Sequence, residues 1–230
     1  MGALSSIPSI KFHWDAYDSS SVTESGGGVT NWASVETTSL LLGGAEAQRP
    51  TYVADGGNGL PAMLFDGVNE YFAPGAGDDI ASPQHIFVRF KQTDHTVDRT
   101  IFAPGTAKKI RQLRWELDDT KFYASGGIDA ATFVDSDTEY QTIDTEFNGA
   151  TSLIRKNGVQ QGGTFDSGSD NRQNFTVGAD FAGVNKFKGY IAQLVVCDVV
   201  QSAANQTIIN NYLQYGPSGS LHQQTLVPGP

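Results

Sequence analysis

The chain has a single cysteine, Cys197, among its 230 residues. One cysteine excludes a framework of intrachain disulfides, so the fold must be stabilised by packing. Because Cys197 lies in the apolar stretch LVVCDVV, we expect it to be a small buried side chain without a chemical role.

Basic residues are also scarce. The chain carries 15 Lys and Arg residues against 25 Asp and Glu residues, which gives a formal net charge of −10. Binding to a nucleic acid requires a stripe of Lys and Arg that neutralises phosphates, and the sequence has none. The composition therefore predicts no nucleic-acid partner.

Long apolar segments and familiar catalytic motifs are missing as well. No stretch is apolar enough to span a bilayer, and residues 1–14 lack the core of a signal peptide, so we expect synthesis in a cytoplasm and no membrane insertion. The sequence contains no G-x-S-x-G, no H-E-x-x-H and no phosphate-binding glycine loop. These absences argue against the common hydrolases, zinc enzymes and nucleotide-binding proteins.

Turn residues, in contrast, are abundant, with 26 glycines spread along the chain. They separate about twelve short apolar segments at the spacing typical of a β-sandwich, without the alternation of strands and helices that a parallel sheet requires. In HIFVRFKQ (residues 85–92), Ile86, Val88 and Phe90 share one face, while Phe87 and Arg89 share the other. The pattern predicts an all-β chain.

Three turns predict hairpins. The strand AMLFDG (residues 62–67) ends at an Asp-Gly turn, from which we expect NEYFA (residues 69–73) to return as its partner. RQLRWELD and KFYASG, separated by DDT, form a second expected hairpin. The third turns at Asn157–Gly158.

The last strand, KGYIAQLVVCDVV (residues 188–200), is followed by a predicted helix. Ser202 is its expected N-cap, and Gly216 followed by Pro217 ends it. Its apolar face contains Ile208, Ile209, Tyr212 and Leu213. So short a helix is stable only when docked, and we expect it to cover an edge or an open end of the sandwich.

This ending, with HWDA (residues 13–16), GGGVTNWAS (26–34), RPTYV (49–53), NGLPAMLFDG (58–67) and TEFNGATSLIRKNG (145–158), resembles concanavalin A-like lectin/glucanase domains of the laminin-G-like kind. Such domains occur in phage virion proteins and bacterial surface proteins. The resemblance implies a jelly-roll sandwich of two antiparallel sheets over residues 11–216. Residues 1–10 and 217–230 would then be N- and C-terminal arms.

The resemblance also raises the question of catalysis. Glucanases of this fold place their acid and nucleophile in a Glu-x-Asp-x-x-Glu string, and retaining hydrolysis needs two carboxylates about 5 Å apart. The nearest string is DSDTE (residues 135–139), which lacks the last Glu. We therefore expect no enzymatic activity.

Calcium is the one cofactor that the resemblance raises, because laminin-G-like domains often bind it at the sandwich rim. Paired carboxylates at turns offer suitable oxygen ligands, although turns select Asp without a metal too. The candidate ligands are Asp78, Asp79, Asp118 and Asp119.

Carbohydrate binding requires an exposed aromatic ring with hydrogen-bonding groups beside it. Trp115 and Tyr123, in the predicted hairpin, are the candidate rings. Trp14 and Trp32 lie in the segments that carry the resemblance, and we expect them in the core.

Three functions fit these observations. The favoured one is a virion structural protein, either a capsid decoration or a tail or fibre component of a bacteriophage. It would form a homo-oligomer such as a trimer and contact a capsid or tail protein of the particle. The alternative is a carbohydrate-binding module at a cell surface or in the extracellular space, where its partner is a surface glycan. A glycosidase is the least favoured. The candidate assembly residues of the arms are Ile7, Ile10, Leu221, Leu226 and Val227.

Overall fold

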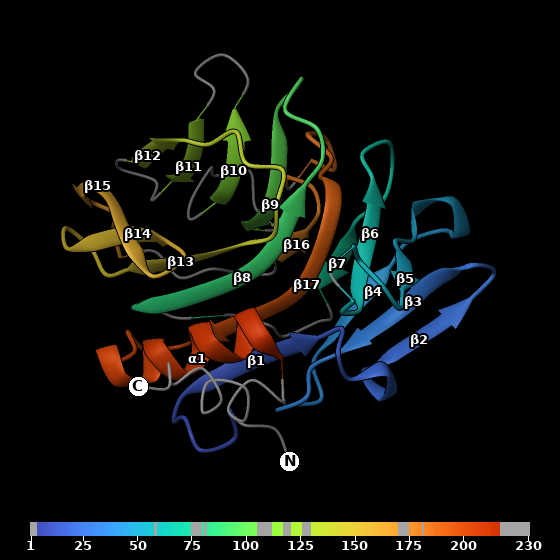
Figure 1. Cartoon of the computed structure of the whole chain (residues 1–230), viewed down its shortest axis with the longest axis horizontal. Helices are drawn as coiled ribbons and strands as arrows, with labels where there is room; N and C mark the ends of the chain where they lie inside the picture. Colours follow the sequence, from blue (N-terminus) through green and yellow to red (C-terminus); the bar gives the residue numbers. More distant parts are fainter. Residues whose placement is uncertain are drawn as a thin grey trace, which may run out of the picture.

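Two antiparallel β-sheets face each other in the computed structural model of the chain, with one α-helix on the outer side of one sheet (Figure 1). This arrangement confirms the predicted all-β sandwich. The structure describes residues 4–57, 59–74, 80, 82–104, 112–116, 121–125, 130–169, 175–180 and 182–216.

Sheet A contains eight strands within the described residues. In spatial order they are β15 (Val159–Phe165), β14 (Ser152–Lys156), β13 (Gln141–Phe147), β8 (Gln84–Gln92), β17 (Lys188–Cys197), β6 (Ala62–Asp66) and β5 (Thr51–Val53), with β1 (Ile10–Asp15) also paired to β17. The Asn157–Gly158 turn forms as predicted between β14 and β15, with positive φ at both residues.

Sheet B contains nine strands over the same described residues. Their order is β12 (Ala130–Val134), β11 (Lys121–Ser125), β10 (Gln112–Glu116), β9 (Arg99–Pro104), β16 (Phe175–Val177), β7 (Phe72–Pro74), β4 (Leu40–Gly43), β3 (Gly28–Ala33) and β2 (Val22–Ser25). The predicted pairing of β10 with β11 is confirmed. Two short 3₁₀ turns, η1 (Ser19–Ser21) and η2 (Glu46–Gln48), lie in the connections.

The hairpin expected around Asp66 and Gly67 is wrong. The turn itself forms, with the Val68 N–H donating to Asp66 Oδ1 at 2.7 Å, but β6 belongs to sheet A and β7 to sheet B. The chain therefore crosses the sandwich here. Phe65 and Phe72 explain the crossing, because both are buried in the core and their rings meet edge to face at 5.9 Å.

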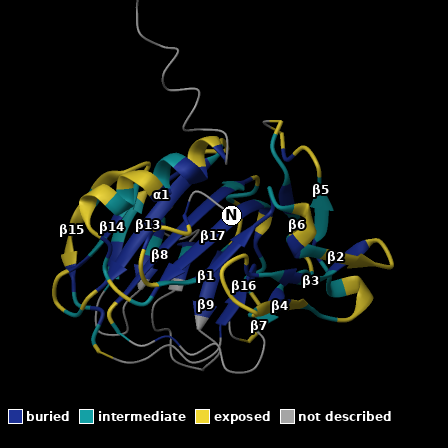
Figure 2. Cartoon of the chain, turned by 90° about the horizontal axis from the view of Figure 1, so that it is seen from below, coloured by how far each residue is buried: buried dark blue, intermediate teal, exposed yellow. Residues whose placement is uncertain are grey.

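The main core lies between the sheets and follows the predicted alternation. Ile86, Val88 and Phe90 point into it, as do the expected core residues Trp14 and Trp32, both fully buried. Phe87 points to the outer face of sheet A. Figure 2 shows that β8 and β17 are buried there as well, beneath the helix.

Helix α1 (Ala203–Tyr215) covers that outer face. The predicted cap is confirmed, since Ser202 Oγ accepts a hydrogen bond from the Asn205 N–H at 3.3 Å. Gly216 ends the helix with φ +72°. The helix therefore lies on a face of sheet A and not over an edge or open end, because a second apolar cluster of β8 and β17 side chains faces outward under it.

Three of the four predicted apolar helix residues enter this second cluster: Ile209, Tyr212 and Leu213. Ile208 is 44% exposed and does not. Cys197 is buried in the same cluster, and burial raises the pKa of its thiol to about 12. This agrees with the expected packing role. No helix in the described residues is long and apolar enough to cross a membrane.

The N-terminal segment also belongs to the second cluster. Leu4 and Ile7 are buried in it, and Ile10 packs against it while beginning β1. Ile7 and Ile10 were expected to reach a neighbouring subunit, but they contact their own chain, because the cluster offers apolar surface near the start of β1. Leu221, Leu226 and Val227 lie outside the described residues.

The second cluster makes a prediction about stability. Leu213→Ala removes a fully buried side chain and should lower the free energy of unfolding by about 2–5 kcal/mol. Ile208→Ala, on the exposed side of the same helix, should change it by no more than about 0.5 kcal/mol. Urea titrations followed by circular dichroism measure both, and equal losses would contradict the packing described.

Candidate functional site

Trp115 does not provide the exposed ring that the predicted carbohydrate site requires. Its side chain is 2% exposed and its Nε1–H donates to the Asp135 carbonyl at 2.8 Å. Trp115 shares the inner face of β10 with Leu113 and lies opposite the buried Phe122, so no sugar can stack on it. Tyr123 is half-buried on the other face, and the Arg114 guanidinium lies 5.7 Å from its ring centre.

The candidate calcium ligands Asp78, Asp79, Asp118 and Asp119 lie outside the described residues. Within the described part of the chain, no group of three or more His, Cys, Asp or Glu side chains is arranged to hold a metal ion.

The DSDTE segment is held by a salt bridge at an end of the sandwich. Lys156 Nζ lies 2.9 Å from Asp135 Oδ1 and 2.6 Å from Asp137 Oδ2. Gln141 also donates to Asp135, which is buried. These contacts indicate that the carboxylates of this segment stabilise the fold.

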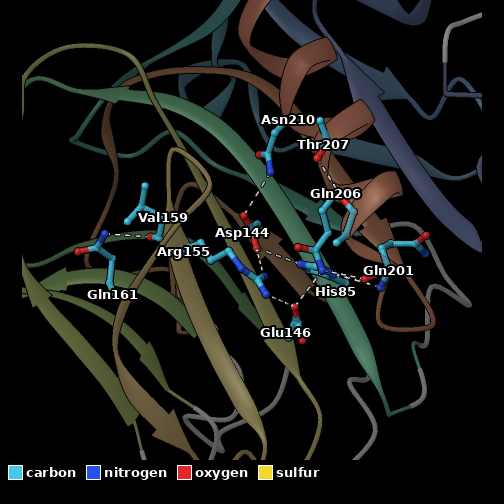
Figure 3. A network of polar contacts seen from close by, with 11 residues as sticks. His85, Asp144, Glu146, Arg155, Val159, Gln161, Gln201, Gln206, Thr207 and Asn210 are labelled. Atoms are coloured by element: carbon cyan, nitrogen blue, oxygen red, sulfur yellow. Dashed lines mark hydrogen bonds and ion pairs between the residues drawn. The ribbon is translucent and has the colours of Figure 1, made fainter.

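A network of charged and amide groups lies between α1 and sheet A (Figure 3). Arg155 of β14 donates to Asp144 at 2.8 Å and to Glu146 at 2.6 Å, both on β13. From the helix, Gln206 donates to Glu146 at 3.1 Å and Asn210 donates to Asp144 at 3.4 Å. The network therefore ties the flank of α1 to two strands.

His85 completes the network beneath the start of α1. The Gln201 N–H donates to His85 Nδ1 at 3.3 Å, so Nε2 carries the proton and donates to Asp144 Oδ1 at 3.1 Å. The ring stacks on Phe87 with centres 4.1 Å apart. His85 is fully buried, and its contacts fix the segment that leads into the helix.

A groove of about 370 Å³ runs along this flank of α1. Its lining consists of amides, hydroxyls, one guanidinium and small residues, without an aromatic ring: Thr142, Arg155, Asn157, Gly158, Ala203, Gln206, Thr207, Asn210, Asn211 and Gln214. Amides both donate and accept hydrogen bonds, and Asn210 Oδ1 is buried without a partner. The groove is suited to ligands rich in hydroxyl or amide groups.

Beyond the C-terminal end of α1, the outer face of sheet A carries three half-buried tyrosines, Tyr17, Tyr140 and Tyr190, which we call the tyrosine cluster. The rings of Tyr140 and Tyr190 are 6.4 Å apart. Tyr17 lies beside the helix end, because a Cβ on Gly216 would come within 3.2 Å of its ring. The Tyr140 hydroxyl donates to the Gly56 carbonyl at 3.1 Å, which fixes that ring.

Arg89 of β8 lies within the tyrosine cluster. Its guanidinium lies 5.1 Å from the centre of the Tyr140 ring, and the residue is 7% exposed. Burial raises the pKa of Tyr17 to about 12, and the positive charge of Arg89 opposes that rise. A hydrogen bond from Arg89 to the Tyr17 hydroxyl opposes the rise as well, but its geometry is poor, and Arg89 Nε has no partner.

The groove and the tyrosine cluster meet at Thr142. This residue lines the groove and is the register partner of Arg89 across β13 and β8. This outer face of sheet A therefore carries two neighbouring parts, the polar groove along the helix and the aromatic cluster at its end. We refer to these two parts together as the helix-flanking surface.

Sequence reasoning missed this surface, although one signal was present. Arg89 alternates with apolar residues in β8 and shares its outward face with Phe87, which is unusual for a charged residue in a central strand. Tyr17, Tyr140 and Tyr190 are far apart in sequence, so only the topology brings them together.

Comparisons with known proteins support the fold. Neither a protein-family profile nor a curated protein sequence matches the chain. Trypanosoma rangeli sialidase matches 90% of this chain with a TM-score of 0.65 and 8% identity, and the chain spans 33% of that protein. Domain 4 of AbnA, a GH43 extracellular arabinanase from Geobacillus stearothermophilus, in complex with arabinotriose, matches 87% of this chain and is itself 96% covered, with a TM-score of 0.57 and 12% identity.

At such low identities the similarity establishes the fold alone. The chain has a β-sandwich fold found among carbohydrate-active proteins. Its function must therefore be argued from its own residues.

The network under α1 makes a second prediction. Arg155→Met leaves Asp144 and Glu146 buried without their cation, and should lower the free energy of unfolding by about 3–5 kcal/mol. Hydrogen exchange should become faster in α1 before it does in β8. The control is Lys188→Met, because the Lys188 side chain is 46% exposed and Asp94 keeps its pair with Arg99, so the loss should be less than about 1 kcal/mol. Similar losses in the two variants would contradict the network's role.

Proposed function

We propose that this domain binds carbohydrate without catalysing its conversion, and that the helix-flanking surface is the binding site. The observation that carries the proposal is the tyrosine cluster beside a groove lined by amides. Sugar rings present apolar C–H faces that pack on aromatic rings, and hydroxyls that exchange hydrogen bonds with amides. Binding sites commonly combine apolar surface with a few well-placed polar groups in this way.

The carboxylates near this surface support binding over catalysis. Asp144 is fully buried and already bound by Arg155 and His85. Asp15 accepts hydrogen bonds from the Tyr212 hydroxyl at 2.6 Å and from Gln193 at 3.0 Å. A glycosidase needs one carboxylic acid and one carboxylate free to reach the same glycosidic bond. Asp144 and Asp15 are not free, so the exposed Glu139 beside Lys91 has no second free carboxyl group in either of them.

Structural relatives support the same proposal at the level of the fold. The arabinanase domain was solved in complex with arabinotriose, and the sialidase in complex with sialic acid. A β-sandwich of this shape is therefore compatible with holding a sugar, and the residues described above give this chain its own means to do so.

Tyr190→Ala tests the proposal. A screen of an immobilised glycan panel identifies a ligand, and titration calorimetry then compares the wild-type protein with the variant. Loss of the ring should weaken binding about tenfold, equivalent to about 1.4 kcal/mol. Thermal unfolding should stay close to that of the wild type, since Tyr190 is half-buried.

The matched control is Tyr71→Ala. Tyr71 is also half-buried, but it precedes β7 of the opposite sheet and packs under Lys186 Nζ, 3.7 Å from its ring centre. It should leave glycan affinity unchanged. Equal affinity of wild type and Tyr190→Ala would remove the tyrosine cluster from the site, and no binding to any glycan would overturn the function.

A role as a structural component of a phage virion is a second proposal, resting on the sequence of residues 217–230. Helix α1 is capped at Gly216, so the Leu and Val residues that follow are not required by the described packing. Deleting residues 217–230 should leave the unfolding temperature unchanged and reduce the mass seen by light scattering from an oligomer to a monomer. A full-length monomer, or an unfolded deletion variant, would contradict this role.

A further inference from the structure

Arg89 and Arg99 are the two Lys or Arg side chains that are buried in the described structure, and only Arg89 has no carboxylate partner there. Arg99 is ion-paired with Asp94, and the half-buried Arg155 and Lys156 also pair with carboxylates. Arg89 is more than nine-tenths buried, yet no Asp or Glu side chain of the described residues lies within 4.0 Å of it. Its close partners among the described residues are two tyrosines: the face of the Tyr140 ring, and the Tyr17 hydroxyl, which lies within reach of a hydrogen bond from the guanidinium.

Nor can the nearest buried carboxylate serve Arg89. Asp15 lies on the same outer face, as the register partner of Gln193, itself paired with Arg89. Its oxygens already accept from Tyr212, from Gln193 and from the Tyr17 N–H at 2.8 Å. Arg89 Nε therefore keeps a hydrogen-bond donor that no described residue uses.

A buried, unpaired guanidinium lowers stability, because its charge loses water without gaining an anion. A Met or Leu at this position would pack beside Phe87 without that cost. Positions where a chain retains such a group are candidates for contact with a ligand that supplies the missing partner.

We propose that Arg89 receives the carboxylate of an acidic sugar, so that the helix-flanking surface selects glycans bearing uronic or sialic acid residues over neutral ones. This inference rests on the proposed function and names its ligand class. A planar guanidinium can donate two parallel hydrogen bonds to a carboxylate. A neutral sugar has no carboxylate and cannot accept this pair.

Asp15 and Asp55 act on the tyrosines of the cluster, and a second cation near Arg89 offsets their negative charge. Lys91 shares the outward face of β8 and is the register partner of Tyr190, so a second positive charge lies beside the tyrosine cluster. Its counter-ion, Glu139, is 3.8 Å away and 86% exposed, so the pair is weak. Tyr17 and Tyr140 are uncharged at neutral pH, and burial raises the pKa of both hydroxyls further.

A sugar ring against Tyr140 and Tyr190 would place its carboxylate toward Arg89, since the guanidinium lies over Tyr140. Neighbouring residues of a longer glycan could then follow the groove past Thr142. Arg89 would thus bind the carboxylate of an oligosaccharide, while the amide-lined groove binds its other sugar residues.

Paired probes test the inference: sialyllactose against lactose, and trigalacturonic acid against its methyl ester. For the acid that fits, the wild-type protein should bind the acidic member at least about tenfold more tightly, the strength of one hydrogen bond to a charged group. Arg89→Met should remove that difference, and Arg89→Lys should restore part of it. Which pair shows the preference distinguishes a sialic from a uronic acid ligand.

Two further readouts separate a binding role from a structural one. Arg89→Met should unfold at a temperature equal to or above that of the wild type, because an unpaired buried charge is removed. The ¹⁵Nε resonance of Arg89, assigned by its loss in Arg89→Lys, should shift with sodium glucuronate and not with glucose, even at millimolar affinity. Arg114→Met is the control, because Arg114 also contacts a tyrosine ring, Tyr123, but in sheet B.

The possible outcomes distinguish failure of the acidic preference from failure of the proposed function. Equal affinity for acidic and neutral partners would overturn the acidic preference while leaving the proposed function standing. A lower unfolding temperature for Arg89→Met, together with an unmoved Arg89 resonance, would make Arg89 structural and overturn the inference. No binding of any saccharide would remove the proposed function and this inference together.

Discussion

The central position of β17 is the constraint on which the rest of this structure depends. One side of β17 pairs with β8 from Gly189 to Cys197, while the other side is shared by β6 and, further along, β1. A register shift between Ile191 and Gln193 allows this change of partner, and the freed Ala192 carbonyl accepts the Ala16 N–H at 3.0 Å. Gly189 is needed for the close pairing, because a Cβ there would lie 2.0 Å from the Lys91 carbonyl oxygen.

This pairing decides what the outer face of sheet A presents. Val195 and Cys197 point outward beside Phe87 and create the apolar area that α1 covers. Tyr190 points outward as well, past the register shift and beyond the helix end. One strand thus supplies both the docking surface of the helix and part of the tyrosine cluster, so the groove and the cluster have a fixed spacing.

Much of the fold could be predicted because it follows local rules. The alternation in β8, the Asn157–Gly158 turn and the Ser202 cap each depend on a few neighbouring residues. The change of sheet after Asp66 could not be predicted, because an Asp-Gly turn forms equally well in a hairpin and in a crossing. The burial of Trp115 could not be predicted either, because the alternation of residues along a strand does not show which of its two faces packs against the other sheet.

The candidate site escaped prediction for a related reason. Arg89 and the tyrosines come from β8, from β17 and from the segments next to β1 and β13, while the groove is lined largely by α1, and no spacing in the sequence links these parts. The rings that looked most suited to a sugar were those in a hairpin, where a Trp and a Tyr lie close together along the chain. Burial reversed that choice, because the larger ring gained more by entering the core.

Asp15 connects the tyrosine cluster to the stability of the domain. Its carboxylate accepts from the Tyr17 N–H at one oxygen and from the Tyr212 hydroxyl at the other, so it joins the tyrosine cluster to the buried side of α1. Burial and the nearby Asp15 charge raise the pKa of Tyr212, which keeps its hydroxyl protonated as the donor. A ligand that orders Tyr17 therefore also favours the docked helix, and binding to the folded state alone stabilises it by mass action. Helix α1 therefore forms one wall of the proposed site. Its docking on sheet A sets the position of Arg89 and the tyrosines relative to a ligand in the groove.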